Sequence, residues 1–445
     1  MEISAEGFAG LWGSLFELVK YQASLSRIIL DYLHEISNVF FYIILTFAAI
    51  ISLGYVILSL YALLHRTKNT VYSFDEKRAP FVTIQIPTRN EIIALRCAKK
   101  CLGFDYPKDR YEILIGDDSD DPEVSRGLAE FARQHARVHV HKRAKNVGFK
   151  PGNLNNMLKH TRGEIIVIFD SDFEPGKDFL RRIVAPFIHD PEIAAVQSRW
   201  KFSNANHNLV TALGATTVNI FHHVFLPVMK PFQTCFLCGS AEAVRKSYLV
   251  EYGGWQSGTL TEDIEYTLRL HARNKKIIYL PTLTCKNEAP VTVMDLCKQQ
   301  MRWGYGVISA YKEHWKKVIT ARDVGLPKRM LSFLGVFGYF VPVFIMLLTV
   351  AGFLVFITHR PEQIDFMKFA VLTARNVSLT LGLIVASTVA LYKAKQFRLF
   401  PRMIAASLSV GLLVTYFVNV GIYKALTNKP MQWFLLKKSK TDIRG

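Results

Sequence analysis

Four long apolar runs without a charged residue constrain this chain more than any other feature of its sequence. A helix needs about 20 mostly apolar residues to cross the hydrocarbon core of a bilayer. One such run is compatible with a buried helix of a soluble protein, but four indicate an integral, multi-pass membrane protein. The runs are Val39 to Leu64, Leu331 to Ile357, Asn376 to Tyr392 with an extension past Arg375 to Phe369, and Met403 to Tyr423.

The first run lies too deep in the chain, and is too long, for a cleaved signal peptide. We therefore interpret residues 38–65 as a permanent transmembrane helix. Residues 1–37 mix apolar side chains with charged ones such as Glu17, Lys20 and Arg27. This pattern predicts an amphipathic helix, or two, lying in the membrane interface. A helix that packs on a soluble domain fits the pattern nearly as well.

The chain carries 55 Lys and Arg against 36 Asp and Glu, a formal net charge of +19. No helix-turn-helix, zinc-finger or ribonucleoprotein pattern accompanies this charge, so we expect no nucleic-acid partner. Many basic residues instead flank the apolar runs, as expected for cytoplasmic loops beside anionic membrane lipids. They are His65, Arg66, Lys68, Arg322, Lys328, Arg329, Lys393, Lys395, Arg398 and Arg402.

The flanking charges place the soluble part, residues 66–320, on the cytoplasmic side of the membrane. A membrane region of about three helices, residues 321–424, and a basic tail, residues 425–445, would follow. Three crossings would put the tail outside, whereas its Lys437 and Lys438 favour the inside. Either the tail is outside or one apolar run lies in the interface, and the sequence leaves both open.

Six cysteines are present, and Cys235 and Cys238 have the spacing of half a zinc site or of a redox pair. A structural zinc site needs two more ligands at matching spacing, and no second paired motif occurs. We therefore expect free thiols in a reducing cytosol.

Apolar strand-like runs alternate with helical runs in the soluble part. This alternation predicts an α/β domain with a mostly parallel sheet that is covered by helices on both faces. In such sheets the ligand-binding side chains collect where the strands end. The expected strands are 81–86, 111–115, 138–140 and 164–169, and the expected helices are 91–102, 123–135 and 264–272.

Asp170-Ser171-Asp172 follows the expected strand 164–169 directly. Two carboxylates two residues apart at a strand end can share a hard divalent cation, Mg²⁺ or Mn²⁺. That cation would bridge the diphosphate of a sugar nucleotide and neutralise charge on the leaving group. Acids also mark ordinary turns, so this motif alone leaves a solvated turn as an equal alternative.

Two more polar segments follow expected strands. Asp117-Asp118-Ser119-Asp120-Asp121 contains carboxylates that could accept hydrogen bonds from a nucleobase or ribose, or could form a solvated turn. Pro87-Thr88-Arg89-Asn90-Glu91 ends the first strand, where a loop would line a bound nucleotide.

A basic, glycine-containing loop, residues 145–155, leads into a helix. Gly148 and Gly152 permit close approach of the backbone, and Lys150 with the helix N-terminal amides would favour a phosphate. The Walker pattern of nucleoside triphosphatases is absent.

Thr261-Glu262-Asp263 precedes the expected helix 264–272. It fits a plain helix cap with acids in the first turn, and it also fits a general base that takes a proton from an acceptor hydroxyl. In Gln299-Gln300-Met301-Arg302-Trp303, the arginine can hold phosphate and the tryptophan can stack on a sugar ring. A tryptophan anchor at the membrane interface is the alternative there.

In this order the motifs resemble those of the processive inverting glycosyltransferases of family 2, the superfamily of cellulose, hyaluronan, chitin and mannan synthases. The order is an Asp-Asp pair, a K-x-x-x-L-N-like loop, D-x-D, T-E-D and Q-x-x-R-W, with apolar runs on both sides. The resemblance covers roughly residues 80–310. Lys286-Asn287-Glu288-Ala289-Pro290 brings it nearest to the mannan and glucomannan synthase branch.

The resemblance implies a GT-A type, Rossmann-like glycosyltransferase domain inserted between transmembrane helices, with interfacial helices at its end. It also implies Mg²⁺ or Mn²⁺ and a UDP- or GDP-sugar donor. Asp263 would be the catalytic base, Asp172 with Asp170 would hold the metal, and Trp303 would lie under the acceptor sugar. The residues expected at the nucleotide sugar are Pro87, Thr88, Glu91, Asp117, Asp118, Lys150, Asp170, Glu262, Gln299, Arg302 and Trp303.

The reaction implied is a single displacement with inversion that extends a glycan. The chain has nothing that resembles a cyclic-dinucleotide domain, and its three or four expected spans are few for a polymer channel in one chain. A lipid glycosyltransferase that adds one sugar to ceramide, diacylglycerol or a polyprenyl phosphate is therefore the first alternative. A non-catalytic membrane scaffold is the second, and the intact acids Asp170, Asp172 and Asp263 argue against it.

Overall fold

The computed structural model describes residues 5–65, 71–359 and 366–432. The chain divides into two compact units. One unit combines residues 1–54 with 341–382, and the other combines residues 55–340 with 383–445. Lys437 and Lys438 of the expected basic tail lie outside the described residues.

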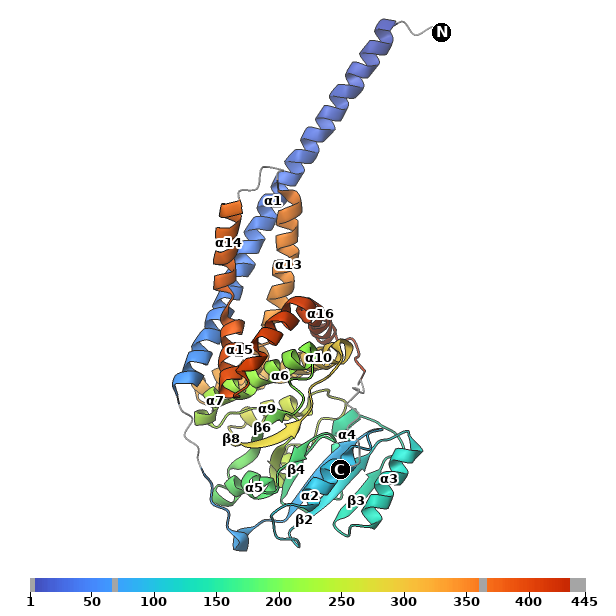
Figure 1. Ribbon diagram of the computed structural model, residues 1–445, viewed down its shortest axis with the longest axis vertical. Coiled ribbons are helices and arrows are strands. Elements are labelled where there is room, and N and C mark those ends of the chain that lie inside the picture. Colours follow the sequence, from blue (N-terminus) through green and yellow to red (C-terminus); the bar gives the residue numbers. More distant parts are fainter. Residues whose placement is uncertain (1–4, 66–70, 360–365, 433–445) are drawn as a thin grey trace. The chain divides into compact units, whose positions relative to one another are not determined.

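An eight-stranded mixed sheet forms the centre of the larger unit, in the order β3-β2-β1-β4-β7-β6-β8-β5 (Figure 1). The four strands expected from the sequence are present and pair in parallel as β3-β2-β1-β4. The strands are β1 (Val82–Thr88), β2 (Tyr111–Asp117), β3 (Val138–Lys142), β4 (Ile165–Ile168), β5 (Glu174–Pro175), β6 (Ile193–Phe202), β7 (Glu242–Arg245) and β8 (Lys276–Asn287).

The expectation of a mostly parallel sheet holds for β3-β2-β1-β4 and for β6 with β8, which also pair in parallel, but not for β7 and β5. β7 lies between β4 and β6 and runs antiparallel to both, and β5 runs antiparallel to β8. The chain runs from β6 through two helices, Leu209–Ile220 and Leu226–Met229, and enters β7 from the turn at residues 238–241. This turn brings residues 238–242 to the edge of the sheet where β1, β2 and β4 end.

Helices cover both faces of the sheet, as expected. Along β2, Ile113 and Ile115 point into one hydrophobic cluster, with α2, α3 and α5, while Leu114 between them points into the other, with α4 and α9. This alternation follows from the two-residue repeat of a strand. The helices are α2 (Ala94–Leu102), α3 (Pro122–Arg133), α4 (Phe149–Leu158), α5 (Phe179–His189), α8 (Lys246–Glu251) and α9 (Glu262–His271).

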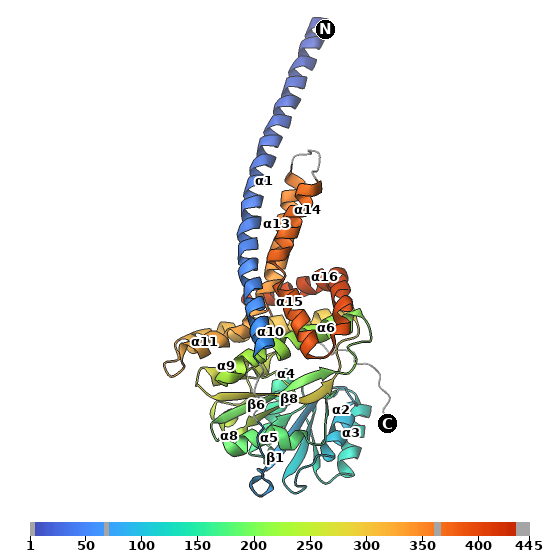
Figure 2. The same ribbon diagram turned by 60° about the vertical axis from the view of Figure 1, so that its left-hand side comes forward.

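A layer of long helices packs beside the sheet in the same unit. α16 (Phe400–Leu426) lies along α10 (Val293–Ile319) and also contacts α6 (Leu209–Ile220), as Figures 1 and 2 show. α6 continues through a π-helical turn (Phe221–Phe225) into α7 (Leu226–Met229). The last apolar run of the sequence therefore packs on the sheet domain along one face, while side chains such as Leu408 and Leu412 on its other face are exposed.

The expected span from Leu331 to Ile357 begins later than the sequence indicates. Its first residues form the short helices α11 (Leu326–Ser332) and α12 (Leu334–Phe337), and Leu331, Phe333 and Leu334 pack against the core of the sheet domain. Only α13 (Phe340–Thr358) remains as a continuous apolar helix. Hydropathy does not distinguish side chains buried by protein from side chains buried by lipid. The sequence therefore shows residues 331–337 and α13 as one apolar run.

The smaller unit contains most of α1 (Ala5–Leu64), together with α13 and α14 (Phe366–Leu379). The expected interfacial segment and first span form one uninterrupted helix, because no proline falls within it. Phe47 stacks on Phe344 with ring centroids 6.3 Å apart. The third apolar run is broken where the backbone N–H of Gly382 donates to Ser52 Oγ (2.8 Å).

In the described residues, four helical segments are long and apolar enough to cross a membrane. One of them, residues 209–232, is mostly buried inside the sheet domain and is therefore accounted for by protein packing. α14 and α15 (Gly382–Lys393), which meet at a 55° bend, would form a fifth segment if counted together. The other three segments are Leu25–Leu64, Phe340–Thr358 and Phe397–Leu426.

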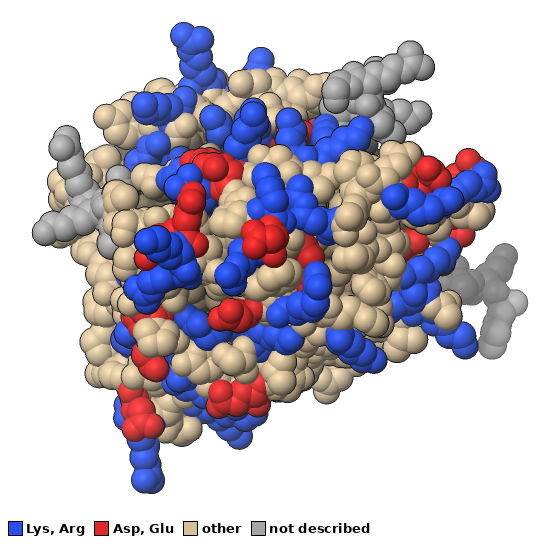
Figure 3. All heavy atoms as spheres, turned by 90° about the horizontal axis from the view of Figure 1, so that it is seen from below, with Lys and Arg blue, Asp and Glu red and all other residues tan. Residues whose placement is uncertain are grey.

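Charged side chains of both signs are interspersed over the face of the molecule shown in Figure 3. Ion pairs of the larger unit include Arg181 with Asp105 (2.6 Å) and Lys276 with Asp190 (2.8 Å). On this face, the basic excess is not gathered into one continuous patch.

We expect Gly421→Ala to weaken the packing of α16 on α10. A Cβ atom at Gly421 would lie 2.3 Å from the carbonyl oxygen of Met301, so the helices must separate, at a cost of about 1–3 kcal/mol. Gly411→Ala in the same helix is the control, since its Cβ would meet only Ser407 Cβ at 3.9 Å. Thermal unfolding of the detergent-solubilised protein should show a lower midpoint for the first variant only, and equal midpoints would contradict this packing.

Candidate active site

A cleft of about 200 Å³ opens where β1, β2 and β4 end, at the carboxyl edge of the parallel half of the sheet. Residues from many separate parts of the sequence, from Pro87 to Trp303, line it. Of the residues expected from the sequence, those on its wall are Pro87, Thr88, Glu91, Asp118, Lys150, Asp170, Asp172, Glu262, Asp263, Gln299, Arg302 and Trp303.

Asp170, Ser171 and Asp172 lie on the cleft wall just beyond β4. The Ser171 hydroxyl donates to Glu91 Oε2, and the Asp170 amide donates to Ser240 Oγ (2.8 Å), so the loop is held from both sides. Both carboxylates are thereby fixed at the cleft.

These carboxylates fit a hard divalent cation, because both are oxygen donors that face the same cleft. Within the described residues, no group of three His, Cys, Asp or Glu side chains could hold a metal by itself. A cation held by Asp170 and Asp172 would therefore take its other ligands from substrate phosphate and water, as Mg²⁺ commonly does in proteins.

Lys150 lies at the centre of the site, in the first turn of α4. Left-handed backbone at Gly148 (φ 75°) turns the chain into this helix. The Lys150 ammonium contacts Asp170 Oδ1 (2.8 Å) and Glu262 Oε1 (2.9 Å) and donates to the carbonyl oxygen of Gly239 (2.6 Å). Burial alone would lower the pKa of Lys150, but the two carboxylates outweigh burial and raise it, so the group is a fixed cation.

Asp263, in the first turn of α9, lies beside this lysine. A Cβ atom at Gly239 would lie 3.3 Å from Asp263 Oδ2 and 3.5 Å from Lys150 Nζ. The carboxylate and the ammonium group therefore both lie next to the backbone of Gly239, which has no side chain. Burial and the neighbouring Glu262 carboxylate raise the pKa of Asp263 to about 7. A carboxyl group with this pKa can exchange a proton near neutral pH.

α10 supplies the opposite wall with Gln299, Arg302 and Trp303. Its position against the segment before Asp263 is set by close contacts between a side chain and the backbone. A Cβ atom at Gly306 would lie 2.4 Å from Thr261 Cγ2, and Arg302 Nη1 donates to the carbonyl oxygen of Leu260 (3.3 Å).

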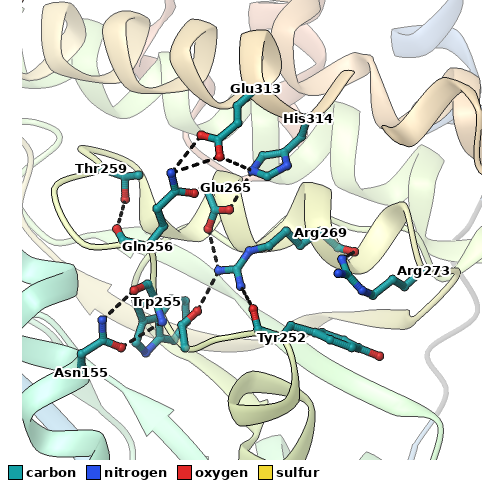
Figure 4. A network of polar contacts seen from close by, with 11 residues as sticks. Asn155, Tyr252, Trp255, Gln256, Thr259, Glu265, Arg269, Arg273, Glu313 and His314 are labelled. Atoms are coloured by element: carbon teal, nitrogen blue, oxygen red, sulfur yellow. Dashed lines mark hydrogen bonds and ion pairs between the residues drawn. The ribbon is translucent and has the colours of Figure 1, made fainter. Parts of the chain in front are cut away.

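A buried polar network, shown in Figure 4, joins the elements that carry these groups. Glu265 of α9 accepts from Arg269 Nη2 (2.6 Å) and contacts His314 Nε2 of α10 (2.8 Å). Arg269 also donates to the carbonyl oxygens of Tyr252 and Gly254, and Asn155 of α4 bonds the backbone of Trp255 in the same loop. α9 and α10 are thus linked through the buried side chains of Glu265 and His314, and α4 is joined to the same network through the amide of Asn155.

The predicted nucleobase contacts are only partly on the cleft. Asp118 lines it and forms a bidentate pair with Arg143, with Arg143 Nε 2.7 Å from Asp118 Oδ1. Asp117 is not part of the wall, because its carboxylate is buried and accepts from the Ser119 amide (2.8 Å) and the Ser125 hydroxyl (2.6 Å). Asp117 therefore shapes the loop, and the expectation that it touches the nucleotide has no support in this geometry.

Several residues on the cleft wall were not expected from the sequence. Trp200 and Phe202 come from β6, and Cys238 and Gly239 come from the turn before β7. A glycine and a serine after a cysteine, at 238–240, signal a tight turn, but nothing in the sequence places that turn at this edge of the sheet. All six cysteines are free thiols, as expected.

Comparison with known proteins agrees with this geometry. Residues 79–306, half of the chain, match the protein family described as glycosyltransferase-like family 2. The chain belongs to this family. The family expected from the motifs is thus confirmed, and so is the α/β glycosyltransferase fold.

Its relatives include the probable glucomannan 4-beta-mannosyltransferase 9 of Oryza sativa subsp. japonica, which is 33% identical over 261 residues. The match covers 56% of this chain and 49% of that relative. Glucomannan 4-beta-mannosyltransferase 2 of Arabidopsis thaliana is 32% identical over the same length, with the same coverage. The chain therefore spans about half the length of the curated relatives it matches.

A solved structure has a similar fold. It is the mannosyltransferase PcManGT from Pyrobaculum calidifontis in complex with GDP-Man and Mn²⁺, with a TM-score of 0.62. The likeness covers 89% of this chain and 100% of that one at 19% identity, and at this identity it supports the GT-A type fold alone.

We expect Glu265→Gln to destabilise the domain by about 3 kcal/mol, because the change leaves the buried Arg269 without its charged partner. Glu313→Gln is the matched control, since Glu313 is 47% exposed and its contacts, with Gln256 and at 3.8 Å with His314, should contribute less than about 1 kcal/mol. Urea unfolding followed by tryptophan fluorescence measures both. Equal losses would show that the buried network does not hold α9 to α10.

Proposed function

We propose that this family 2 glycosyltransferase is an inverting mannosyltransferase that transfers mannose from GDP-mannose to a hydroxyl of a glycan acceptor. The observation that carries the proposal is that Lys150, Asp170 and Asp263 line one cleft, with Lys150 in contact with Asp170 and with the carbonyl of Gly239 beside Asp263. A transferase of this type needs a cation for the leaving diphosphate and a base for the acceptor within reach of one anomeric carbon.

The choice of donor is supported by the relatives. The glucomannan 4-beta-mannosyltransferases of rice and Arabidopsis are named for mannosyl transfer, and the solved neighbour was determined with GDP-Man and Mn²⁺. Of the UDP- and GDP-sugars that the sequence leaves open as donors, these relatives favour GDP-mannose.

Asp170 and Asp172 would hold the divalent metal, Mn²⁺ or Mg²⁺. When bound, the metal supplies positive charge for the departing diphosphate. Lys150 adds a fixed cation on the same side, and Arg302 faces it from α10 as a second one. Because this charge is held in place before the reaction, little reorganisation is needed as the leaving group becomes more negative.

Asp263 is the proposed general base. It takes the proton of the acceptor hydroxyl as the hydroxyl oxygen bonds to the anomeric carbon, and the bond from that carbon to the phosphate oxygen breaks on the opposite side. GDP leaves with the electron pair, and the configuration of the sugar inverts. Trp303 and Gln299 orient the acceptor ring from α10.

We also propose a membrane location, with the cleft facing the cytoplasm. The support is the set of apolar helices and the basic residues that flank them in the sequence.

For the acceptor, a glycan is our first choice. A lipid acceptor is the second candidate, since α16, with exposed apolar side chains such as Leu408, packs on the helix that carries Trp303.

The proposal is tested by incubating the purified full chain and Mn²⁺ with radiolabelled GDP-mannose, GDP-glucose, UDP-glucose or UDP-N-acetylglucosamine, each with manno-oligosaccharide and lipid acceptors. We expect transfer from GDP-mannose, with a product ladder by mass spectrometry for a polymerase and one added hexose for a lipid enzyme. Asp263→Asn should lose transfer and keep GDP binding. Transfer only from a uridine donor, or normal turnover by Asp263→Asn, would refute the donor or the base, respectively.

The pH dependence of transfer offers a separate check on Asp263. Because the base must be ionised and its pKa is raised to about 7, kcat/KM should fall about tenfold per pH unit below 7. Glu262→Gln removes a charge that raises this pKa, so it should move the acid limb to lower pH. An acid limb that stays in place in the Glu262→Gln variant would show that another group controls it.

A further inference from the structure

Glu242 is a buried acid that belongs to none of the motifs recognised in the sequence. It is the first residue of β7 and lies in register between Ile168 of β4 and Gln197 of β6, at the middle of the sheet. Only 1% of the residue is exposed. An ionisable group in such a place is costly unless polar partners compensate for the water it has lost.

Its partners are the backbone amides of the turn that precedes β7. Glu242 Oε2 accepts from the amides of Cys238 (3.0 Å) and Gly239 (2.8 Å), and Gln197 Oε1 also accepts from Cys238 (2.8 Å). The turn contains two left-handed residues, Gly239 (φ 82°) and Ala241 (φ 51°), so regular strand pairing cannot satisfy these amides. Glu242 therefore defines the shape of the turn.

The same turn contacts three groups of the cleft. The carbonyl of Gly239 accepts from Lys150 Nζ (2.6 Å), and Ser240 Oγ accepts from the Asp170 amide (2.8 Å). The bare Cα of Gly239 lies against Asp263, where a Cβ atom would approach Oδ2 to 3.3 Å. A shift of this turn would therefore move the cation, the metal-binding loop and the base relative to one another.

We propose that Glu242 is a positioning residue of the catalytic centre, which fixes the turn at residues 238–241 and thereby the placement of Lys150, Asp170 and Asp263 around that turn. The proposal rests on the proposed function for its kinetic consequence. Its structural consequence, the order of the turn, does not depend on that function.

Glu242 holds the turn by accepting hydrogen bonds from its amides, and this role does not require a negative charge. Burial and the neighbouring Asp263 carboxylate raise the pKa of Glu242 to about 8, while Lys150 opposes them, so the side chain can remain protonated at neutral pH. One carbonyl-type oxygen has two lone pairs and can serve both amides. A glutamine at this position should then replace the acid, whereas an alanine should not.

The kinetic test compares Glu242→Gln and Glu242→Ala in the full chain, using GDP-mannose, Mn²⁺ and saturating acceptor. We expect Glu242→Ala to lose kcat by about 10- to 100-fold, because the reacting groups are misplaced. The KM for donor should change less than about threefold, and Glu242→Gln should stay near the wild type in both constants. Full kcat in Glu242→Ala, or equal losses in both variants, would overturn the proposal.

Glu112→Gln is the matched control for loss of a buried acid. Glu112 is 2% exposed, pairs with Arg162 (2.6 Å) and accepts from Thr83 Oγ1 (2.7 Å), away from the cleft wall. The Glu112→Gln variant should have a lower free energy of unfolding and an unchanged kcat. If its kcat falls as far as that of Glu242→Ala, the effect is general weakening of the sheet, and the positioning role is rejected.

Hydrogen exchange separates this proposal from the proposed function. In Glu242→Ala the amides of Cys238 and Gly239 should exchange faster than in the wild type, and in Glu242→Gln they should not. If the wild type transfers no sugar from any donor, the proposed function fails while the exchange result still decides on Glu242. Unchanged exchange in Glu242→Ala overturns the positioning role whatever the turnover.

Discussion

The buried ammonium of Lys150, held by Asp170, Glu262 and the carbonyl of Gly239, is the interaction on which the rest of the site depends. Lys150 belongs to α4, and its three partners come from the loop after β4, from α9 and from the turn before β7. A buried cation is tolerated only where several oxygens surround it, so the four segments must meet at one place. The position of Asp263 follows from the same meeting point, since it shares Gly239 with the lysine.

α10 has a comparable role for the outer wall of the cleft. It carries Arg302 and Trp303, and glycines permit its close contacts with its neighbours, Gly306 against Thr261 and Gly421 of α16 against Met301. Contacts at this distance leave little freedom for either helix. α10 and α16 therefore pack closely on each other and on the segment that carries the proposed base, Asp263. The Glu265–His314 pair adds a polar link between α9 and α10.

Much of the site could be predicted because carboxyl ends of parallel strands share one edge of a sheet. Asp170, Lys150 and Asp263 each follow or precede a strong local pattern, and all three lie on the cleft. For Asp117, contact with the nucleotide stays a prediction, and the structure shows its carboxylate hydrogen-bonded within its own turn. The reversed strand β7, with Glu242, was missed because its apolar pattern is too short to reveal direction or neighbours.

By itself, the sequence determined the alternation of strands and helices, the apolar segments and the order of the chemical motifs, because these depend on residues close together in the chain. Tertiary structure alone decided which apolar residues are covered by protein, as in Leu331 and Phe333, and which carboxylates share Lys150. Both depend on contacts between distant segments. Local patterns carry no information about these contacts, since burial by lipid and burial by protein select the same side chains.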